Sequence, residues 1–546
     1  MAGSMMDMLF GKNMKEYKEA VTAKVRGNIP LWLQGRLLRN GPGMHTVGET
    51  RYSHWFDGLA LLHCFSVKSG NVYYFNRYLE SNTYKANIKA NRIVVSEFGT
   101  MAYPDPSTSV FSKAFSYLSH TIPDFTDNCL INIMKCGKYC YALTETNYIW
   151  KIDLLNLQVC EKIDYRKYVG VNVATAHPHY DEAGNVINIG TSIMNKGKTK
   201  YVIFKVPATV PEGKKKNCWK HAEVLCSINS RSLLSPSYYH SFGMTENYII
   251  FLEQPFKMDI LKMATAYVRG VSWASCLNFH KDDKTYIHII DQRTRKPVVT
   301  QFYTGPMVVF HHVNAYEEDG CVVFDVVAYE DSSLYDFFYL DNLTQNFKDN
   351  TKPTSIPILK RFAVPLHVDK DAEKGSNLIK LASTTAKALK EEGDQVYCQP
   401  EVLREGLEMP QINYAYNGKP YRYVFATEVQ WNPIPTKILK YDLLTKSYVE
   451  WGEEHCWPGE PVFVAKPDAE AEDDGIILSV VLSTTPQKHP FLLILDAKSF
   501  TELARASFDV EMYMDLHGLF IPAPDWEAEL ECPPMEASLD YAASMS

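Results

Sequence analysis

The sequence has no long hydrophobic run near its N-terminus, which argues against a secretory signal peptide or an N-terminal membrane span. The first twenty residues, MAGSMMDMLFGKNMKEYKEA, contain no apolar stretch of the length that either segment needs. We interpret residues 1–5 as an expression remnant. The expectation is a cytosolic protein whose contact with membranes, if any, is peripheral and reversible.

The chain also has no C-x-x-C pair and no excess of basic residues. Twelve cysteines without a secretory signal are typical of reduced thiols in the cytosol, and the missing C-x-x-C spacing argues against a cysteine zinc site. With 56 basic and 64 acidic residues, the formal net charge is −8. A nucleic-acid partner usually requires a basic face, so we expect none.

Long stretches of helical periodicity are nearly absent. Short β-type runs separated by turn residues dominate instead, for example CYALTETNYIWKI, GCVVFDVVAY and FLLILDA. The sequence therefore predicts an all-β fold.

A weak internal repeat indicates how these strands are organised. Four segments each end a strand on an aspartate, turn over polar residues and begin another strand, at Asp153, Asp291, Asp442 and Asp496. Aspartate suits such a turn because its carboxylate can accept hydrogen bonds from backbone N–H groups two residues on. Repeated strand–turn–strand units favour the blades of a β-propeller, interrupted by insertions because their spacing is irregular. A pair of β-sandwiches is the alternative.

No linker rich in glycine or serine divides the chain, so residues 6–521 are expected to form one domain. Residues 522–546 are acidic and contain prolines, and this composition predicts a disordered tail.

Aromatic residues and histidines, by contrast, are plentiful. The chain has 34 Tyr, 26 Phe and 9 Trp. Sheet-rich proteins favour aromatic residues in any case, and a pocket for a long apolar ligand would also use them.

Four of the sixteen histidines lie in or beside an apolar–aromatic strand: His177 in ATAHPHYD, His240 in SYYHSFGM, His311 in VVFHHVNAY and His517 in DLHGLF. No local metal motif has such wide spacing, so only a closed, radially arranged fold could bring them together. A propeller does so, because the inner strand of each blade faces the central axis. The alternative is four unrelated core histidines.

The strings LLRNGPGMH, HWFDGLALLH, TAHPHYD, YYHSFGMTENY, FHHVNAYEEDG, WPGEPVF and DLHGLF resemble the carotenoid cleavage oxygenase family. They occur in the family's order from about residue 35 to residue 520, nearly the whole chain. The resemblance implies a seven-bladed β-propeller with an axial metal site, in which inserted loops and short helices cover one face. It also implies that the four histidines hold ferrous iron, Fe(II).

The resemblance further assigns the residues that hold those ligands. Within HPH and HH the first histidine is the implied ligand, which leaves His179 and His312 as neighbours. Glutamates that anchor the second nitrogen of each imidazole match Glu145, Glu408 and Glu460, and such partners fix the tautomer and raise the ligand's basicity. Without the resemblance, each would be interpreted as a surface glutamate.

The implied reaction is cleavage of beta-carotene by dioxygen at its central 15,15′ double bond, giving two molecules of all-trans-retinal. Candidates for the wall of a substrate tunnel are Tyr238, Tyr329, Phe56 and Trp457, although ordinary core packing would explain each. Alternatives on the same scaffold are eccentric carotenoid cleavage and retinyl-ester isomerohydrolysis. A non-catalytic carotenoid-binding propeller is the alternative from another class. A monomer is expected.

A carotenoid dissolved in a membrane must reach such a tunnel. Residues 110–118 place apolar side chains on one helical face, including Phe111, Phe115 and Leu118, and Leu233 and Leu234 add further apolar groups. A buried helix is the alternative interpretation. Ser107 replaces the cysteine that some relatives carry there as a possible lipid-attachment point, so membrane contact should be reversible.

Overall fold

The computed structural model describes residues 5–11, 13–102, 124–210, 217–343, 355–429, 434–485 and 488–523. Strands dominate these residues, and the helices among them are short. The all-β prediction is therefore confirmed.

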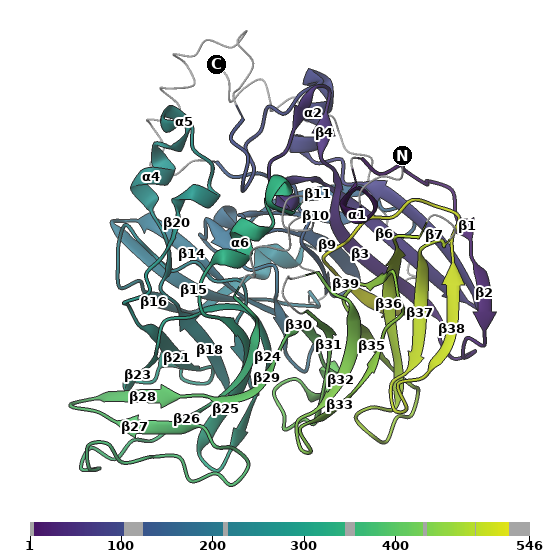
Figure 1. The fold of residues 1–546 in the computed structure, drawn as a ribbon. Helices are drawn as coiled ribbons and strands as arrows, with labels where there is room; N and C mark the ends of the chain where they lie inside the picture. Colours follow the sequence, from purple (N-terminus) through teal and green to yellow (C-terminus); the bar gives the residue numbers. More distant parts are fainter. Residues whose placement is uncertain are drawn as a thin grey trace.

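The strands form mostly antiparallel sheets that fan around a common axis (Figure 1). The first sheet has the strand order β1 (Val21–Thr22), β7 (Asn71–Tyr78), β6 (Leu59–Lys68), β3 (Gly35–Met44) and β39 (His517–Pro522). The second has the order β11 (Val159–Asp164), β10 (Tyr148–Ile152), β9 (Tyr139–Leu143) and β8 (Asn132–Cys136). The third has the order β12 (Val173–Ala174), β14 (Val186–Asn195), β15 (Lys198–Val206) and β16 (Glu223–Asn229), and β13 (His179–Tyr180) also pairs with β14.

Four more sheets continue the ring. The fourth sheet has the order β17 (Gly243–Met244), β18 (Tyr248–Glu253), β21 (Thr285–Asp291), β23 (Gln301–Thr304), β28 (Gln395–Gln399) and β27 (Lys387–Lys390), and β22 (Lys296–Pro297) also pairs with β21. The next two have the orders β24 (Val308–Glu318), β25 (Cys321–Tyr329), β26 (Ile358–Pro365), β29 (Glu401–Glu405) and β30 (Leu407–Gln411), β31 (Tyr423–Glu428), β32 (Lys437–Asp442), β33 (Ser447–Trp451), respectively. The last has the order β2 (Lys24–Gly27), β38 (Glu502–Ser507), β37 (Phe491–Asp496), β36 (Gly475–Ser483) and β34 (Cys456–Pro458), and β35 (Val462–Ala465) also pairs with β36. Two-stranded ribbons pair β19 (Phe256–Met258) with β20 (Leu277–Phe279), and β4 (Thr46–Val47) with β5 (Thr50–Arg51).

The two ends of the chain close this ring by exchanging strands. β39, near the C-terminus, pairs with β3 of the first sheet, and the N-terminal β2 pairs with β38 of the last. Each exchange satisfies the backbone hydrogen bonds that an open edge would leave exposed. The propeller prediction is confirmed.

The repeated aspartate turns join neighbouring strands in four different sheets. In each, the carboxylate accepts a hydrogen bond from the backbone N–H two residues on, at 2.8 to 3.1 Å, as predicted. The fourth residue after each aspartate has a positive φ of 55° to 59°, namely Leu157, Arg295, Lys446 and Phe500. The four turns therefore share one loop geometry as well as one hydrogen bond.

Short helices decorate the sheets: α1 (Met5–Leu9), α2 (Asn82–Ala90), α4 (Ile260–Ala264), α5 (Ala266–Arg269) and α6 (Ser333–Phe337), with 3₁₀ turns at Trp55–Asp57, Tyr165–Lys167, Cys218–His221, Ala274–Cys276 and Tyr414–Tyr416. Figure 1 shows α2, α4, α5 and α6 on the same face of the propeller. These four short helices therefore lie on one side of the ring.

Candidate metal centre and its pocket

Four histidines from distant parts of the sequence meet on the inner side of the ring. His177 lies between β12 and β13, His240 precedes β17, His311 belongs to β24 and His517 begins β39. One ligand atom from each lies within 4.8 Å of all the others. The closed ring thus gathers the histidines that the sequence singled out.

The nitrogens of these imidazoles fit a metal ion. The Nε2 atoms of His177 and His240 are only 2.9 Å apart, and the buried Nε2 of His311 has no hydrogen-bond partner in the described part of the chain. Burial lowers the pKa of His177 well below its usual range, and the neighbouring imidazoles lower it further. Burial also lowers the pKa of His517, although Glu460 acts in the opposite direction. Neutral imidazoles that converge in this way can bind a transition metal.

In three of the four imidazoles, the second ring nitrogen, Nδ1, contacts a glutamate carboxylate. The carboxylate–Nδ1 distances are 2.5 Å for Glu145 and His240, 2.8 Å for Glu408 and His311, and 2.5 Å for Glu460 and His517. Each contact turns a ring so that its Nε2 points toward the shared centre. Each of the three predicted glutamates thus contacts one histidine of the group.

Each glutamate also accepts a hydrogen bond on its second carboxylate oxygen. Tyr238 donates to Glu145 at 2.6 Å, Tyr329 to Glu408 at 2.7 Å and Arg39 to Glu460 at 2.8 Å. Burial and the adjacent carboxylates keep the pKa of both tyrosines well above the usual range, so their hydroxyls remain donors.

Glu460 and Glu408 stay ionised despite their burial. Burial opposes ionisation of Glu460, but its contacts with His517 and Arg39 outweigh that effect and lower its pKa to about 2. The pKa of Glu408 is likewise lowered, because His311 and Tyr329 outweigh the effect of burial.

His179 and His312, the second members of the two histidine pairs, stand outside the four-histidine group. His179 uses both ring nitrogens elsewhere: Nε2 contacts the carbonyl oxygen of Phe242 at 2.9 Å, and Nδ1 the hydroxyl of Tyr414 at 3.0 Å. The His312 ring stacks on Phe324 with centroids 6.2 Å apart.

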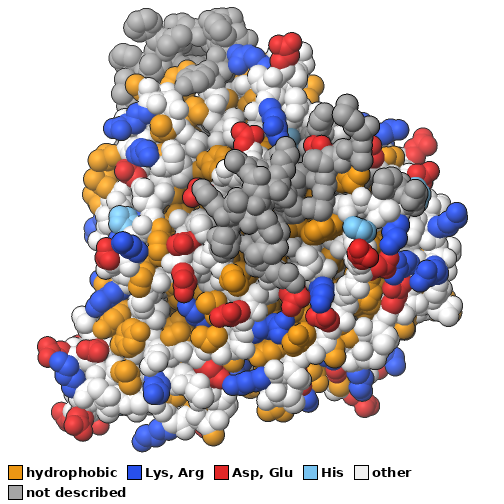
Figure 2. Space-filling view, viewed as in Figure 1, with side chains coloured by type: hydrophobic (Ala, Val, Ile, Leu, Met, Phe, Trp, Pro, Cys, Tyr) orange, Lys and Arg blue, Asp and Glu red, His pale blue; other side chains and the backbone are white. Residues whose placement is uncertain are grey.

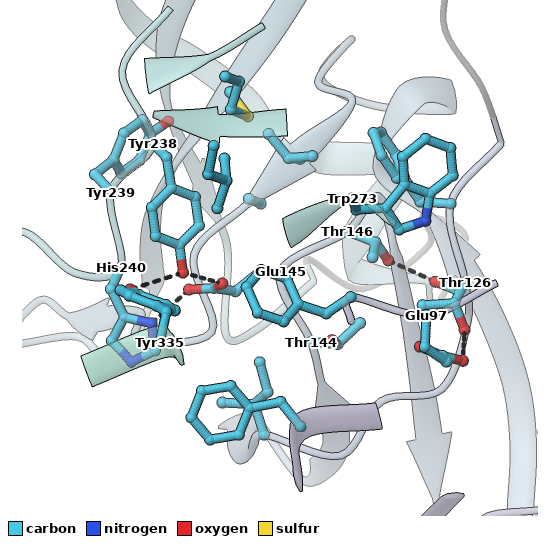
Figure 3. Close-up of a pocket in the computed structure, with 18 of the residues that line it drawn as sticks. Glu97, Thr126, Thr144, Glu145, Thr146, Tyr238, Tyr239, His240, Trp273 and Tyr335 are labelled. Carbon is cyan, nitrogen blue, oxygen red and sulfur yellow. Dashed lines mark hydrogen bonds and ion pairs between the residues drawn. The ribbon is translucent and has the colours of Figure 1, made fainter. Parts of the chain in front are cut away.

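A pocket of about 1190 Å³, including its open mouth, lies beside the four histidines. His240 and His517 reach it, and its wall is mostly apolar and aromatic, with Phe310, Trp273 and Leu277 among its residues. Figure 3 shows the Tyr238 hydroxyl directed toward Glu145 and His240 at one side of the pocket, with Trp273 and Glu97 at the other. A metal held by the histidines would therefore face a largely apolar pocket.

Comparison with known proteins decides the family. Residues 10–522 match the family model described as retinal pigment epithelial membrane protein. The chain is 73% identical over 530 residues to beta,beta-carotene 15,15'-dioxygenase of Mus musculus, covering 97% of this chain and 94% of the relative. It is 74% identical over 526 residues to the Homo sapiens protein of the same name, covering 96% of each.

The chain belongs to the retinal pigment epithelial membrane protein family, which is the carotenoid oxygenase family.

More distant relatives agree. The mitochondrial carotenoid-cleaving dioxygenase of Homo sapiens is 39% identical over 524 residues, covering 93% of this chain and 90% of the relative. A solved variant of Synechocystis apocarotenoid oxygenase covers 95% of this chain and is itself covered to 99%, with a TM-score of 0.71 at 23% identity. A cobalt-substituted form of that enzyme has a TM-score of 0.73 at 23% identity and the same coverage. At this identity the structural likeness concerns the fold. The carotenoid oxygenase family inferred from the motifs is confirmed.

The predicted tunnel residues divide into two groups. Phe56 and Tyr238 line the pocket of this family member, whereas Tyr329 and Trp457 are not among the described residues that line it. Tyr329 instead holds Glu408, and the Trp457 indole donates to Thr484 at 3.2 Å. The sequence could not separate them, because a local pattern does not show whether an aromatic side chain faces the pocket or a polar partner from another segment.

The predicted membrane-facing residues are only partly described. Phe111, Phe115 and Leu118 lie outside the described residues. Leu233 is 41% exposed and Leu234 is half-buried beside α4, where its carbonyl accepts the backbone N–H of Ile260 at 3.0 Å.

Sequence reasoning missed Arg39, although a signal was present. It interrupts an apolar strand in LLRNGPG, where an arginine is costly to bury unless it is paired. In the structure it is 1% exposed and contacts both Glu460 and Asp515.

Proposed function

We propose that this protein is an iron-dependent dioxygenase that cleaves beta-carotene at its central 15,15′ double bond into two molecules of all-trans-retinal. The observation that carries the proposal is the four-histidine group at the wall of an apolar pocket. Relatives named beta,beta-carotene 15,15'-dioxygenase at 73% and 74% identity over nearly the whole chain support this bond and this substrate.

Iron is the metal that we propose for the four-histidine group. Neutral imidazoles suit Fe(II), and without a carboxylate among the ligands the ion keeps its full positive charge. When bound, the iron supplies the activation of dioxygen. The chain's own contribution is to bring the four imidazoles together and to fix three of them through Glu145, Glu408 and Glu460.

The pocket is proposed to bind the polyene by burial alone. A hydrocarbon offers no group for a hydrogen bond, so its affinity comes from apolar surface removed from water, at about 25 cal/mol per Å². Phe56, Phe310 and Tyr238 form part of this wall. Their ring faces can also stabilise positive charge on the polyene by cation–π attraction.

The finer architecture belongs to the same proposal. We infer one blade from each sheet of four or more strands, of which the described residues form seven. We also infer one domain over residues 6–521 that acts as a cytosolic monomer. Closure of the ring by β2 and β39, which ties the two ends of the chain together, supports a single unit.

Reversible membrane contact is proposed at the face that carries α4 and α5. Leu261 and Val268 are 60% and 84% exposed there, and Lys262 and Arg269 belong to the same two helices. Figure 2 shows hydrophobic and basic side chains close together in this region, at the upper left. Met263 of α4 lines the pocket, so the proposed membrane contact lies next to the proposed substrate site. No helix among the described residues has the length and apolar character needed to span a membrane.

Chromatography of the products tests the proposed reaction. Iron-loaded protein incubated with beta-carotene and dioxygen should yield retinal as its aldehyde product. Two carbonyl products of unequal length, either two aldehydes or an aldehyde and a ketone, would indicate eccentric cleavage. Conversion of a retinyl ester without carotene cleavage would indicate isomerohydrolysis, and binding without any product would indicate a carotenoid-binding propeller.

A further inference from the structure

Two of the four histidines are held by chains of identical chemistry, each running from a tyrosine hydroxyl through a glutamate to an imidazole. In the first, which we call the His240 arm, Tyr238 donates to Glu145 Oε2 at 2.6 Å, and Glu145 Oε1 lies 2.5 Å from His240 Nδ1. In the second, the His311 arm, Tyr329 donates to Glu408 Oε1 at 2.7 Å, and Glu408 Oε2 lies 2.8 Å from His311 Nδ1.

The two arms differ in what they touch. All three members of the His240 arm line the pocket, whereas no member of the His311 arm is among the described residues that line it. Tyr329 is 1% exposed and lies within the core. An occupant of the pocket would therefore touch the His240 arm directly, whereas it would reach the His311 arm only through Phe310, whose ring lies 5.0 Å from that of His311.

Further pocket residues pack directly against the His240 arm. The Phe310 ring stacks on the His240 imidazole, with centroids 4.2 Å apart and planes 25° apart. The Tyr335 hydroxyl donates to the Tyr238 hydroxyl at 3.3 Å. Both Phe310 and Tyr335 line the pocket (Figure 3 labels Tyr335). Because protein interiors are closely packed, an occupant that presses on these rings must displace or tighten their contacts.

We infer that Tyr238 is a positioning residue that couples occupancy of the pocket to the metal. A carotenoid seated against Tyr238 and Phe310 changes the hydrogen bond from Tyr238 to Glu145, and Glu145 passes the change to the orientation of His240. Hydrogen bonds to an ionised carboxylate are short and directional, so a small movement of the donor reorients the acceptor. The inference rests on the proposed function only in taking a carotenoid as the occupant.

The matched variants Tyr238→Phe and Tyr329→Phe test this coupling. Each variant removes the tyrosine hydroxyl that donates to one glutamate and leaves the aromatic ring in place. The ring contacts of Tyr238 with Phe256 and Tyr335 do not depend on that hydroxyl. Both variants should weaken Co(II) binding by about 10-fold in competition with a chelator, because each loosens a partner of a ligand.

The decisive readout is low-temperature electron paramagnetic resonance of the Co(II)-loaded protein, with and without detergent-dispersed beta-carotene and in the absence of dioxygen. Carotene should change the spectrum of the wild type and of Tyr329→Phe, and should leave that of Tyr238→Phe unchanged. Glu145→Gln and Glu408→Gln give the same comparison if either phenylalanine variant fails to fold.

Three outcomes would overturn the inference: no spectral change in the wild type, an undiminished change in Tyr238→Phe, or an equal loss in Tyr329→Phe. Product analysis of the iron-loaded wild type is separate. Absence of retinal there would refute the proposed reaction, while the spectral contrast would still decide the coupling.

Discussion

At the residue scale, the contacts of each ring nitrogen distinguish a candidate metal ligand from its neighbour. His179 lies two residues from His177, yet both of its nitrogens contact oxygens of Phe242 and Tyr414. His177, by contrast, directs Nε2 toward the shared centre. One short segment, His-Pro-His, therefore places one imidazole in the four-histidine group and gives the other imidazole polar partners outside it.

Replacing His240 tests the ligand assignment. His240→Ala should abolish both iron content and turnover, because it removes one nitrogen from the group and leaves Glu145 without its imidazole partner. Elemental analysis of purified protein measures the iron. His179→Ala is the control and should retain the metal; an iron-replete, active His240→Ala would show that the assignment is wrong.

Replacing Glu460 tests the role of the glutamates, with a defined dependence on pH. Glu460→Gln keeps the side-chain size but removes the charge, and should lower metal affinity by about 10–100-fold. Since the pKa of Glu460 is lowered from 4.5 to about 2, its ionised form contributes fully above the ordinary value and is lost only as the pH falls through about 2.

The loss of metal affinity in Glu460→Gln, relative to the wild type, should therefore stay constant from about pH 5 to pH 8. Chelator competition across that range measures it. A deficit that vanishes within the range would mean that the carboxylate titrates there, and that its contact with His517 is weaker than the structure shows.

Sequence reasoning was strong for residues whose chemistry carries a family motif and weak for residues that act through a partner. The four histidines and three glutamates could be named because each stands in a distinctive string. Tyr329 was placed in the tunnel wall and Arg39 was missed, because their roles depend on which strand faces which across the ring. Pairing between sheets is a tertiary property that local patterns do not encode.

At the element scale, the aspartate turns could be predicted because both partners of the hydrogen bond lie within three residues. The left-handed residue that ends each of these turns was not predicted: Leu157, Arg295, Lys446 and Phe500 share no side-chain type that favours positive φ. Its conformation follows from closure of the loop rather than from the residue itself.

Gly518 tests whether the closing strand positions its histidine. A Cβ at Gly518 would lie 1.8 Å from the carbonyl oxygen of Leu38 in β3, so Gly518→Ala must displace β39 next to His517. Overpacking of this kind costs about 1–3 kcal/mol, and metal affinity should fall as well.

Chemical denaturation and chelator competition measure the two effects of Gly518→Ala. Gly305→Ala is the matched control, because no heavy atom of the described residues other than its chain neighbours lies within 4 Å of its added Cβ. Unchanged metal affinity in Gly518→Ala would separate strand closure from the metal centre.

At the scale of the whole molecule, the ring makes one centre from residues 340 positions apart in sequence, His177 to His517. The sequence indicated a propeller through its strand pattern and its repeat. It could not indicate that β2 and β39 exchange between the first and last sheets, because both are short and carry no pairing signal of their own.

The α4–α5 face tests the proposed membrane contact. Leu261→Ser with Val268→Ser should weaken liposome binding and slow turnover of membrane-held carotene, while turnover of detergent-dispersed carotene should be retained. Val299, which is 89% exposed between β22 and β23, gives the control Val299→Ser. Equal losses in both substrate formats would point to a structural role for these helices.

The stoichiometry of the reaction tests the central claim most directly. Beta-carotene consumed, retinal formed and iron bound are measured together in one preparation, before and after removal of the metal by a chelator. The account predicts two molecules of retinal for each beta-carotene consumed, with activity proportional to bound iron and lost on its removal. Retinal formed by the metal-free protein, or carbonyl products of unequal length from the iron-loaded protein, would contradict it.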